Sequence, residues 1–246
     1  MSLIRLHVAD ALAQGATLTL GEAQARYLAA VMRRSVGDAV LVFNGRDGEW
    51  QAAIATLAKG RATLAIGHRT RAQTSSPDLW LLAPVLKRET LEWMVEKATE
   101  LGAARILAVT TERSAVTRTN PERLTAIAAE AAEQCERLDV PVVDAPQPLA
   151  TVLAGWNPDR RLVVGDERGR SPPIADAIAG EAPGPWAVLV GPEGGFTARE
   201  LDGLRKLPFC RLASLGPRIL RAETAALSAL AVLQALAGDW RDHHLA

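Results

Sequence analysis

The spacing of hydrophobic positions changes character part-way along the chain. Its first part predicts short strands at residues 40–43, 50–56 and 62–66. The first two of these are separated by Asn44-Gly45 and Asp47-Gly48, which are strong turn signals. A single helix is expected over residues 22–32. The first part therefore reads as a small, mostly β, barrel-like unit.

From residue 79 onwards, strands and helices alternate. Residues 79–85 form a continuous apolar run, which is typical of a buried parallel strand, and further strands are expected at residues 105–110, 161–164, 186–190 and 211–215. Helical spacing follows the first run up to Gly102, a natural stop, and Asn120-Pro121 is a typical helix start. A capping box at residues 197–200 begins a further helix, and the last helix runs from about Ala222 to Gly238. This alternation indicates a parallel sheet covered by helices.

The polar segment 69–78 is the expected linker between a first domain at residues 1–72 and a second at residues 73–246. A length of 246 residues and a hydrophobic content of 48% allow one large domain or two smaller ones. The net charge is zero, but residues 1–72 hold nine Lys and Arg against five Asp and Glu. This excess suits a surface that faces a polyanion, although chance variation in a small domain explains it about as well.

Several classes of protein are excluded by what the chain lacks. Its two cysteines, Cys135 and Cys210, form neither a disulfide framework nor a metal motif. The four histidines make no metal site or catalytic triad, so no metal is expected. The amino terminus is no signal peptide, and no apolar run is long enough to span a membrane. The expected setting is the reducing cytoplasm.

Two polar turns rich in glycine and proline each follow a predicted strand and lead into a helix. The first is Gly191-Pro-Glu-Gly-Gly195, and the second lies within residues 215–225. Ligands of parallel sheets bind beyond the carboxyl ends of the strands, so the pair predicts a ligand site there. An ordinary glycine-rich connection explains the first turn alone equally well. Neither turn matches GxxxxGK or GxGxxG, which disfavours a nucleoside triphosphate or a dinucleotide.

The second turn carries the charged residues Arg218, Arg221 and Glu223 around the start of the last helix. Taken singly, each has an ordinary structural explanation. Glu223 suits the positive end of the helix dipole, and Arg221 could simply pair with it. Two such turns at one edge of a sheet shift the balance toward a functional site.

Two segments of the chain closely resemble the motifs of a known family. The segments LVGPEGGF at residues 189–196 and LGPRILRAETA at residues 215–225 resemble the signature of the ribosomal small-subunit RNA (uridine-N3)-methyltransferase family, of the SPOUT class. Further matching segments are KATELG at residues 97–102, residues 112–114 and 130–137, and residues 4–8 and 31–38 near the amino terminus. Ala222, Glu136 and Met32 depart from the usual pattern, but none replaces a charged motif residue.

The resemblance implies an α/β fold, with a SPOUT-type trefoil-knotted parallel-sheet domain at residues 73–246. A PUA-like β-barrel that binds RNA would occupy residues 1–72. The knotted domain would bind S-adenosylmethionine and form a homodimer. The implied cofactor contacts are Asp166, Leu189, Val190, Gly191, Pro192, Glu193, Gly194, Gly195, Leu215, Gly216, Ile219 and Leu220.

The implied reaction is methylation of uridine N3 in small-subunit (16S) ribosomal RNA, as the naked RNA or the assembled small subunit. N3 carries a proton and lies on the Watson–Crick edge, so the base must be unpaired and its anion stabilised. Arg221 or Arg218 would stabilise a carbonyl that gains charge, and Glu223 is the candidate base. An alternative role for Glu223 is to orient Arg221.

Arginines of the first domain are the expected RNA contacts, with Arg33-Arg34 beside Tyr27 as the best cluster. The full set is Arg5, Arg26, Arg33, Arg34, Arg46, Arg69 and Arg71. Two other readings remain open. One is a SPOUT methyltransferase that acts on a ribose 2′-hydroxyl or on another RNA, and the other is a non-catalytic RNA-binding assembly factor.

Overall fold

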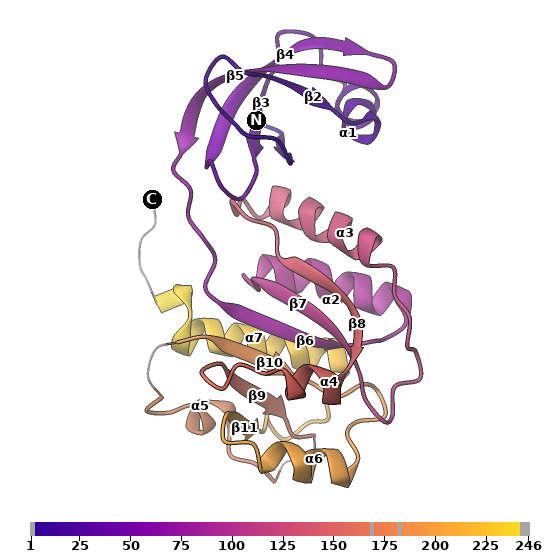
Figure 1. Cartoon of the computed structure of the whole chain (residues 1–246), viewed down its shortest axis with the longest axis vertical. Coiled ribbons are helices and arrows are strands. Elements are labelled where there is room, and N and C mark those ends of the chain that lie inside the picture. Colours follow the sequence, from indigo (N-terminus) through magenta and orange to yellow (C-terminus); the bar gives the residue numbers. More distant parts are fainter. Residues whose placement is uncertain (1–2, 168–169, 182–183, 242–246) are drawn as a thin grey trace. The chain divides into compact units, whose positions relative to one another are not determined.

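The computed structural model describes residues 3–167, 170–181 and 184–241, and divides them into two compact units (Figure 1). Unit 1 comprises the chain up to residue 75 together with residues 132–140. Unit 2 comprises residues 76–131 and the chain from residue 141 onwards. The segment 132–140, which the sequence analysis placed in the second domain, thus packs with the first unit.

Unit 1 is built on a five-stranded sheet in the order β1-β3-β4-β5-β2. The strands are β1 (Arg5–His7), β2 (Thr17–Leu20), β3 (Ala39–Phe43), β4 (Glu49–Ala58) and β5 (Arg61–Arg71). β1 pairs with β3 in parallel, and the other pairings are antiparallel. The core is apolar, with fully buried Leu6, Leu28, Val40, Ile54 and Leu64. The strands β3, β4 and β5 were predicted from the sequence, whereas β1 and β2, the two shortest, were not.

The helix expected over residues 22–32 consists of two different pieces. α1 (Glu22–Arg26) is a short α-helix, and it continues as a π-helix over Tyr27–Val31. In this wider turn the amide of Met32 donates to the carbonyl of Tyr27 at 2.9 Å. The chain then reverses at Arg33, whose φ of 50° lies in the left-handed region. Such wide turns are rare in proteins, and those that occur are often found at functional sites.

Arg5 is a structural residue of unit 1, and this corrects its assignment as an RNA contact. Its side chain is only 5% exposed, and its Nε lies 2.7 Å from a carboxylate oxygen of Glu49. Its other nitrogens donate to the carbonyls of Ala132, Glu133 and Arg137, each at 3.0 Å. A guanidinium that is buried and holds four hydrogen bonds in this way is not accessible to a phosphate. It also explains why residues 132–140 pack in unit 1.

Unit 2 contains a six-stranded, fully parallel sheet in the order β11-β9-β10-β6-β7-β8. The strands are β6 (Leu79–Pro84), β7 (Arg105–Thr110), β8 (Val142–Pro148), β9 (Arg161–Gly165), β10 (Trp186–Leu189) and β11 (Cys210–Ala213). All but β8 were predicted as strands. β8 contains two prolines and lies at the edge of the sheet, where a missing amide donor is tolerated.

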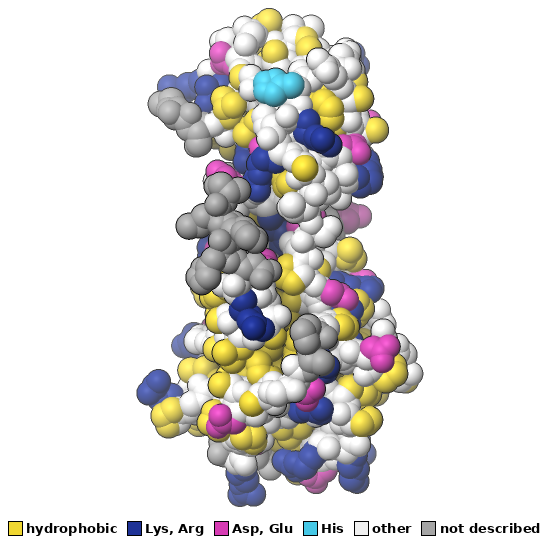
Figure 2. All heavy atoms as spheres, turned by 90° about the vertical axis from the view of Figure 1, so that its left-hand side faces the viewer, with side chains coloured by type: hydrophobic (Ala, Val, Ile, Leu, Met, Phe, Trp, Pro, Cys, Tyr) yellow, Lys and Arg dark blue, Asp and Glu magenta, His cyan; other side chains and the backbone are white. Residues whose placement is uncertain are grey.

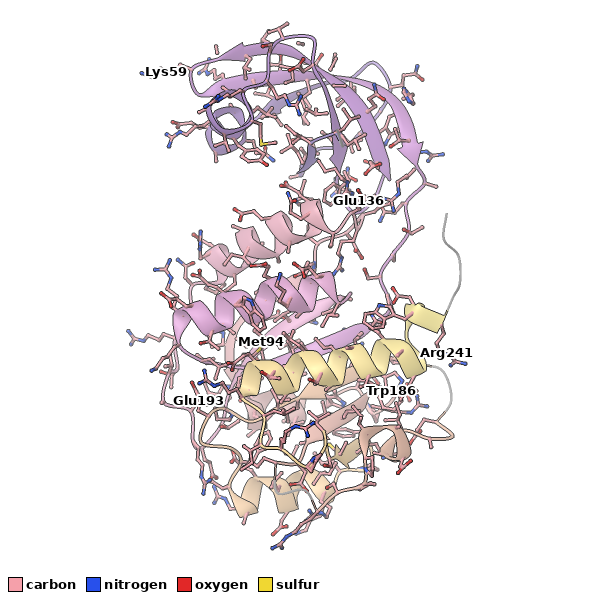
Figure 3. The ribbon with its side chains drawn as sticks, turned by 180° about the vertical axis from the view of Figure 1, so that it is seen from behind. Lys59, Met94, Glu136, Trp186, Glu193 and Arg241 are labelled. Carbon is pink, nitrogen blue, oxygen red and sulfur yellow. The ribbon has the colours of Figure 1, made fainter. Side chains whose placement is uncertain are left out.

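Helices cover both faces of this sheet. α2 (Arg88–Glu100) and α7 (Ala222–Ala237) lie side by side on one face, as Figure 3 shows from that side. α4 (Leu149–Ala154) and α6 (Ala198–Arg205) pack into the apolar core of the other face, through Leu149, Leu201 and Leu204. The remaining helical segments are α3 (Pro121–Gln134), α5 (Ile174–Ala177) and a 3-10 turn at Asp239–Arg241.

Two predicted helix starts are confirmed by their hydrogen bonds. Thr197 and Glu200 form the complete capping box of α6. The side chain of Asn120 accepts from the amide of Arg123 at 3.0 Å at the start of α3.

Both cysteines are free, and burial raises the pKa of the Cys210 thiol to about 12. No helix of the described residues is long and apolar enough to cross a membrane.

A buried arginine, Arg160, packs at the amino ends of strands in the sheet of unit 2. The guanidinium of Arg160 lies 3.6 Å from the ring centre of Trp80. It also donates to a carboxylate oxygen of Asp78 at 2.6 Å and to the carbonyl of Trp186 at 3.3 Å. Cation–π contact and charge-assisted hydrogen bonds at one residue make this edge a stabilising centre.

Replacing Arg160 by methionine should lower the free energy of unfolding by about 2 kcal/mol, because the buried carbonyl of Trp186 and the carboxylate of Asp78 lose a charged donor while most of the packing stays. Urea denaturation followed by circular dichroism measures it. Arg205→Met is the matched control, because the ion pair of Arg205 within the described part of the chain is an exposed one with Asp202, and the substitution should change stability by less than about 0.5 kcal/mol. Equal effects of the two substitutions would contradict this role.

Candidate active site

The strand order of unit 2 marks one edge of the sheet as the place for a ligand. β7 and β8 continue from β6 on one side, whereas β10, β9 and β11 lie on the other. This reversal makes the carboxyl ends of β6 and β10 a topological switch point, where ligands of parallel sheets bind. Figure 3 places Trp186 at the amino end of β10 and Glu193 beyond its opposite, carboxyl end.

A cavity of about 690 Å³ lies at this carboxyl edge, within unit 2. Its volume falls in the range of small-molecule and cofactor sites. Its walls come from the segments that follow β6, β9, β10 and β11. The lining residues are Lys87, Thr90, Gly165, Asp166, Glu167, Val190, Gly191, Pro192, Glu193, Gly194, Gly195, Leu215, Gly216, Arg218, Ile219, Leu220, Arg221, Ala222, Glu223 and Ala225.

The cavity brings together every residue of the candidate catalytic and cofactor sets except Leu189. Leu189 is fully buried inside β10 and contributes to the core instead. Sequence reasoning missed Lys87 and Thr90, which begin α2, and Glu167, which follows β9. The rule that located the two turns also applies to the segment after β6, but the chain alone does not show that β6 is the neighbour of β10.

The turn at residues 191–195 is a tight, backbone-rich wall. The amide of Gly195 donates to the carbonyl of Pro192 at 2.8 Å, and Gly195 has a φ of 65°. A Cβ on Gly191 would come within 3.2 Å of the Gly195 backbone. Glycine is therefore required for the turn to close, and its backbone groups can approach a ligand directly.

A loop after β7 braces this turn from outside the cavity. Arg113 donates from Nη1 to the carbonyl of Gly194 at 2.8 Å. The amide of neighbouring Glu112 donates to a carboxylate oxygen of Glu200 at 2.9 Å, and the Glu112 carboxylate accepts from Nε of Arg199 at 3.0 Å. The hydrogen bond from Arg199 lowers the pKa of Glu112 below its ordinary value. This loop therefore ties the glycine turn to the start of α6.

Asp166 forms a buried side of the cavity. The residue is 5% exposed, and its carboxylate accepts from the hydroxyl of Ser171 at 2.7 Å. Its amide donates to the carbonyl of Ala213 at 2.8 Å, which continues the pairing of β9 with β11. Ser214 extends this edge, because its amide donates to the carbonyl of Pro172 at 2.8 Å. Asp166 is thus a fixed carboxylate rather than a mobile surface group.

Arg221 and Glu223 lie at the start of α7 without pairing to each other. Arg221 is the N-cap of the helix and makes no side-chain capping bond, and Glu223 is in the first turn. Neither residue, nor Arg218, forms an ion pair or a side-chain hydrogen bond within the described part of the chain. The structural explanation that Arg221 serves to neutralise Glu223 therefore fails, and both groups are available to a ligand.

The other arginines expected to contact RNA remain at the surface of unit 1. Arg26, Arg33, Arg46, Arg69 and Arg71 are exposed, and Arg34 is half-buried. Some already have partners. Arg26 lies 3.4 Å from Glu22, and Arg46 donates to the carbonyl of Ala9 at 2.8 Å. Arg71 donates to the carbonyl of Glu136 at 2.9 Å.

Arg33 and Arg34 have no such partner among the residues that the structure describes, and they lie just beyond Met32, the C-cap of the π-helix that contains Tyr27. They remain the best candidates for phosphate contacts.

No group of three or more His, Cys, Asp and Glu among the described residues is arranged to hold a metal ion. His243 and His244 lie outside the described residues.

Comparison with known proteins decides the family. A model of the RNA methyltransferase domain matches residues 74–234, and a model of the RNA methyltransferase PUA domain matches residues 20–67. The chain belongs to the RNA methyltransferase family. The fold of unit 2 and the barrel-like unit 1 are thereby confirmed as this family's α/β domain and PUA domain.

Relatives matched along nearly the whole chain carry a more specific name. The ribosomal RNA small subunit methyltransferase E of Rickettsia conorii is 30% identical, over 94% of this chain and 95% of the relative. The protein of the same name from Synechocystis is 36% identical, over 94% of this chain and 77% of the relative. These family members match both units rather than the methyltransferase domain alone.

Two solved structures resemble the chain closely. A putative methyltransferase from Legionella pneumophila, in complex with S-adenosylmethionine, has a TM-score of 0.88 at 30% identity and covers 97% of this chain and 100% of its own. A ribosomal RNA small subunit methyltransferase E from Neisseria gonorrhoeae, bound to S-adenosyl methionine, has a TM-score of 0.89 at 27% identity with the same coverage.

Replacing Arg113 by methionine should weaken cofactor binding about tenfold, because the Gly194 carbonyl loses the hydrogen bond that holds the turn. Calorimetric titration with S-adenosylmethionine measures the change. Arg118→Met, an exposed site in the same loop, is the control and should leave affinity unchanged. If Arg113→Met left affinity at the wild-type value, the brace would have no bearing on the site.

Proposed function

We propose that this protein transfers a methyl group from S-adenosylmethionine to N3 of a uridine in small-subunit ribosomal RNA. The observation that carries the proposal is the cavity at the carboxyl edge of the sheet. It combines a backbone-rich glycine turn with an arginine and a carboxylate, Arg221 and Glu223, that have no partners of their own among the described residues. The family membership of the chain supports the same activity.

The residues present fit S-adenosylmethionine. The cavity has a suitable volume, and the turns at residues 191–195 and 215–220 offer backbone donors and acceptors for adenine and ribose. Asp166, Glu167 and Glu193 place negative charge beside them, which complements a ligand that carries a sulfonium and an ammonium group. When bound, the cofactor supplies an activated methyl group on a positively charged sulfur.

The chain's own residues would prepare the nucleophile. Glu223 accepts the N3 proton, and the electron pair left on N3 forms the new bond to the methyl carbon as the carbon–sulfur bond breaks. Arg221, assisted by Arg218, stabilises the negative charge that the flanking uracil carbonyl takes up as the proton leaves. Aligning these groups and excluding water is the protein's share of the catalysis.

Unit 1 would hold the RNA. A PUA domain with exposed Arg33, Arg46 and Arg69 suits a polyanionic partner, and such contacts make binding sensitive to salt. Because N3 pairs in a duplex, the target uridine must be unpaired or splayed out before it enters the cavity.

The remaining expectations concern the assembly. A homodimer through unit 2 is supported by exposed hydrophobic side chains on its helical face, namely Trp93 of α2, Leu236 of α7 and Trp240. Figure 2 shows a further group of hydrophobic side chains, on the side of unit 2 that lies at the left of Figure 1. The trefoil knot and a cytoplasmic setting stay predictions.

Methyl transfer from labelled S-adenosylmethionine to purified ribosomal subunits tests the proposal. Small subunits from cells that lack this protein should accept label, whereas large subunits and small subunits from wild-type cells should not. Calorimetry should show cofactor binding in the absence of RNA. Cofactor binding without transfer to any small-subunit substrate would point to another RNA, and absence of both would favour a non-catalytic assembly factor.

A further inference from the structure

Lys87 is a cation of the cavity that the reaction proposed above does not use. It lies three residues after the end of β6 and lines the cavity together with Thr90, which is in the first turn of α2. The side chain is exposed and makes no ion pair or hydrogen bond within the described part of the chain. By contrast, nearby Arg88 pairs with Glu92 at 2.7 Å outside the cavity. The unpaired ammonium group beside the cavity is therefore available to bind a ligand.

The position of Lys87 is unfavourable for the helix that it begins. Lys87 is the N-cap residue of α2 and makes no side-chain capping bond. Ser, Thr, Asp and Asn are preferred there, and a cation meets the positive end of the helix dipole. Arg221 occupies the same position in α7, which lies beside α2 (Figure 3). Two neighbouring helices thus begin with a cation at one cavity, and an anion bound there would relieve the repulsion.

Charges of opposite sign come to the cavity from different elements. Asp166, Glu167 and Glu193 follow β9 and β10, beside the glycine turn. Lys87 and Arg221 come from the starts of α2 and α7. The carboxylates suit the cationic cofactor, whereas the cations suit a substrate group that is negative or becomes negative.

We propose that Lys87 is a further substrate contact, whose ammonium group binds an anionic oxygen of the target nucleotide. This oxygen belongs either to the uracil ring as N3 loses its proton or to a flanking phosphate. The assignment rests on the function proposed above. A lysine acts here as a compact point charge, which can neutralise either oxygen without the fixed two-pronged geometry of an arginine.

The test compares Lys87→Met with Lys87→Arg, which keeps the charge, and with Lys206→Met, an exposed lysine at the end of α6. Wild-type transfer to small subunits is measured first, so that failure of the proposed function is seen separately. For Lys87→Met we expect an affinity for S-adenosylmethionine within twofold of wild type and a kcat/KM for small subunits at least tenfold lower. Lys87→Arg should recover part of this loss, and Lys206→Met should show none.

Whether the loss of kcat/KM in Lys87→Met comes from kcat or from KM identifies which oxygen Lys87 contacts. If Lys87 stabilises the uracil anion, Lys87→Met lowers kcat and shifts the kcat–pH curve to higher pH, because the bound uridine then holds its N3 proton more tightly. If Lys87 binds a phosphate, KM rises, its salt dependence becomes shallower and the pH profile stays in place. An unchanged kcat/KM would overturn the proposal. So would a loss of cofactor affinity as large as the loss of kcat/KM, which would assign Lys87 to the cofactor.

Discussion

Replacing Arg221 by alanine should lower the turnover of methyl transfer about a hundredfold or more while leaving affinity for S-adenosylmethionine nearly unchanged. The guanidinium is placed at the cavity and has no ion pair with Glu223, so its charge is available to the uracil carbonyl. Removing one donor that stabilises a developing oxyanion costs a factor of this size in other enzymes. Single-turnover kinetics with small subunits, beside calorimetry with the cofactor, separates the two quantities.

The control for Arg221→Ala is Arg205→Ala, which removes an exposed arginine of α6 whose partner among the residues that the structure describes is Asp202. It should turn over at the wild-type rate. Wild-type turnover in Arg221→Ala would remove Arg221 from the chemistry. A parallel loss of cofactor affinity would make it part of the cofactor site instead.

Replacing Glu223 by glutamine should also lower turnover strongly, by about a hundredfold at neutral pH, because the amide cannot accept the N3 proton. The substitution keeps the size of the side chain and its place in the first turn of α7. The rate of the variant should rise toward alkaline pH, since uridine then loses its proton without help from a base. The measurement is the pH dependence of the single-turnover rate.

Glu122→Gln, which alters an exposed carboxylate in the first turn of α3, serves as the control for Glu223→Gln and should leave the pH profile in place. A Glu223→Gln enzyme with normal turnover and the wild-type pH profile would show that water or the RNA itself takes the proton.

The parallel sheet of unit 2 was predictable because its strands are buried on both faces and are therefore continuous apolar runs. β6, β7 and β10 are examples. β8 escaped detection because an edge strand tolerates proline and polar side chains. The π-helix at Tyr27–Val31 has no period that distinguishes it from the helix expected there, so only the backbone bonds reveal it.

The part of the site that comes from motifs close together in the sequence was predictable. Arg218, Arg221 and Glu193 were found because two unusual turns follow strands close together in the sequence. Lys87 was missed because β6 lies far upstream, and only the strand order places it beside β10. The prediction that Arg5 contacts RNA was wrong because the carbonyls that enclose its side chain also come from a distant part of the sequence, residues 132–137.

Identification of the methylated nucleoside tests the central claim most directly. Small subunits from cells that lack the protein are methylated with labelled S-adenosylmethionine, and their RNA is digested to nucleosides that are separated by retention and mass. The cavity with Arg221 and Glu223 predicts 3-methyluridine as the labelled product. A 2′-O-methylated nucleoside would keep the fold and the cofactor but contradict a reaction at the base.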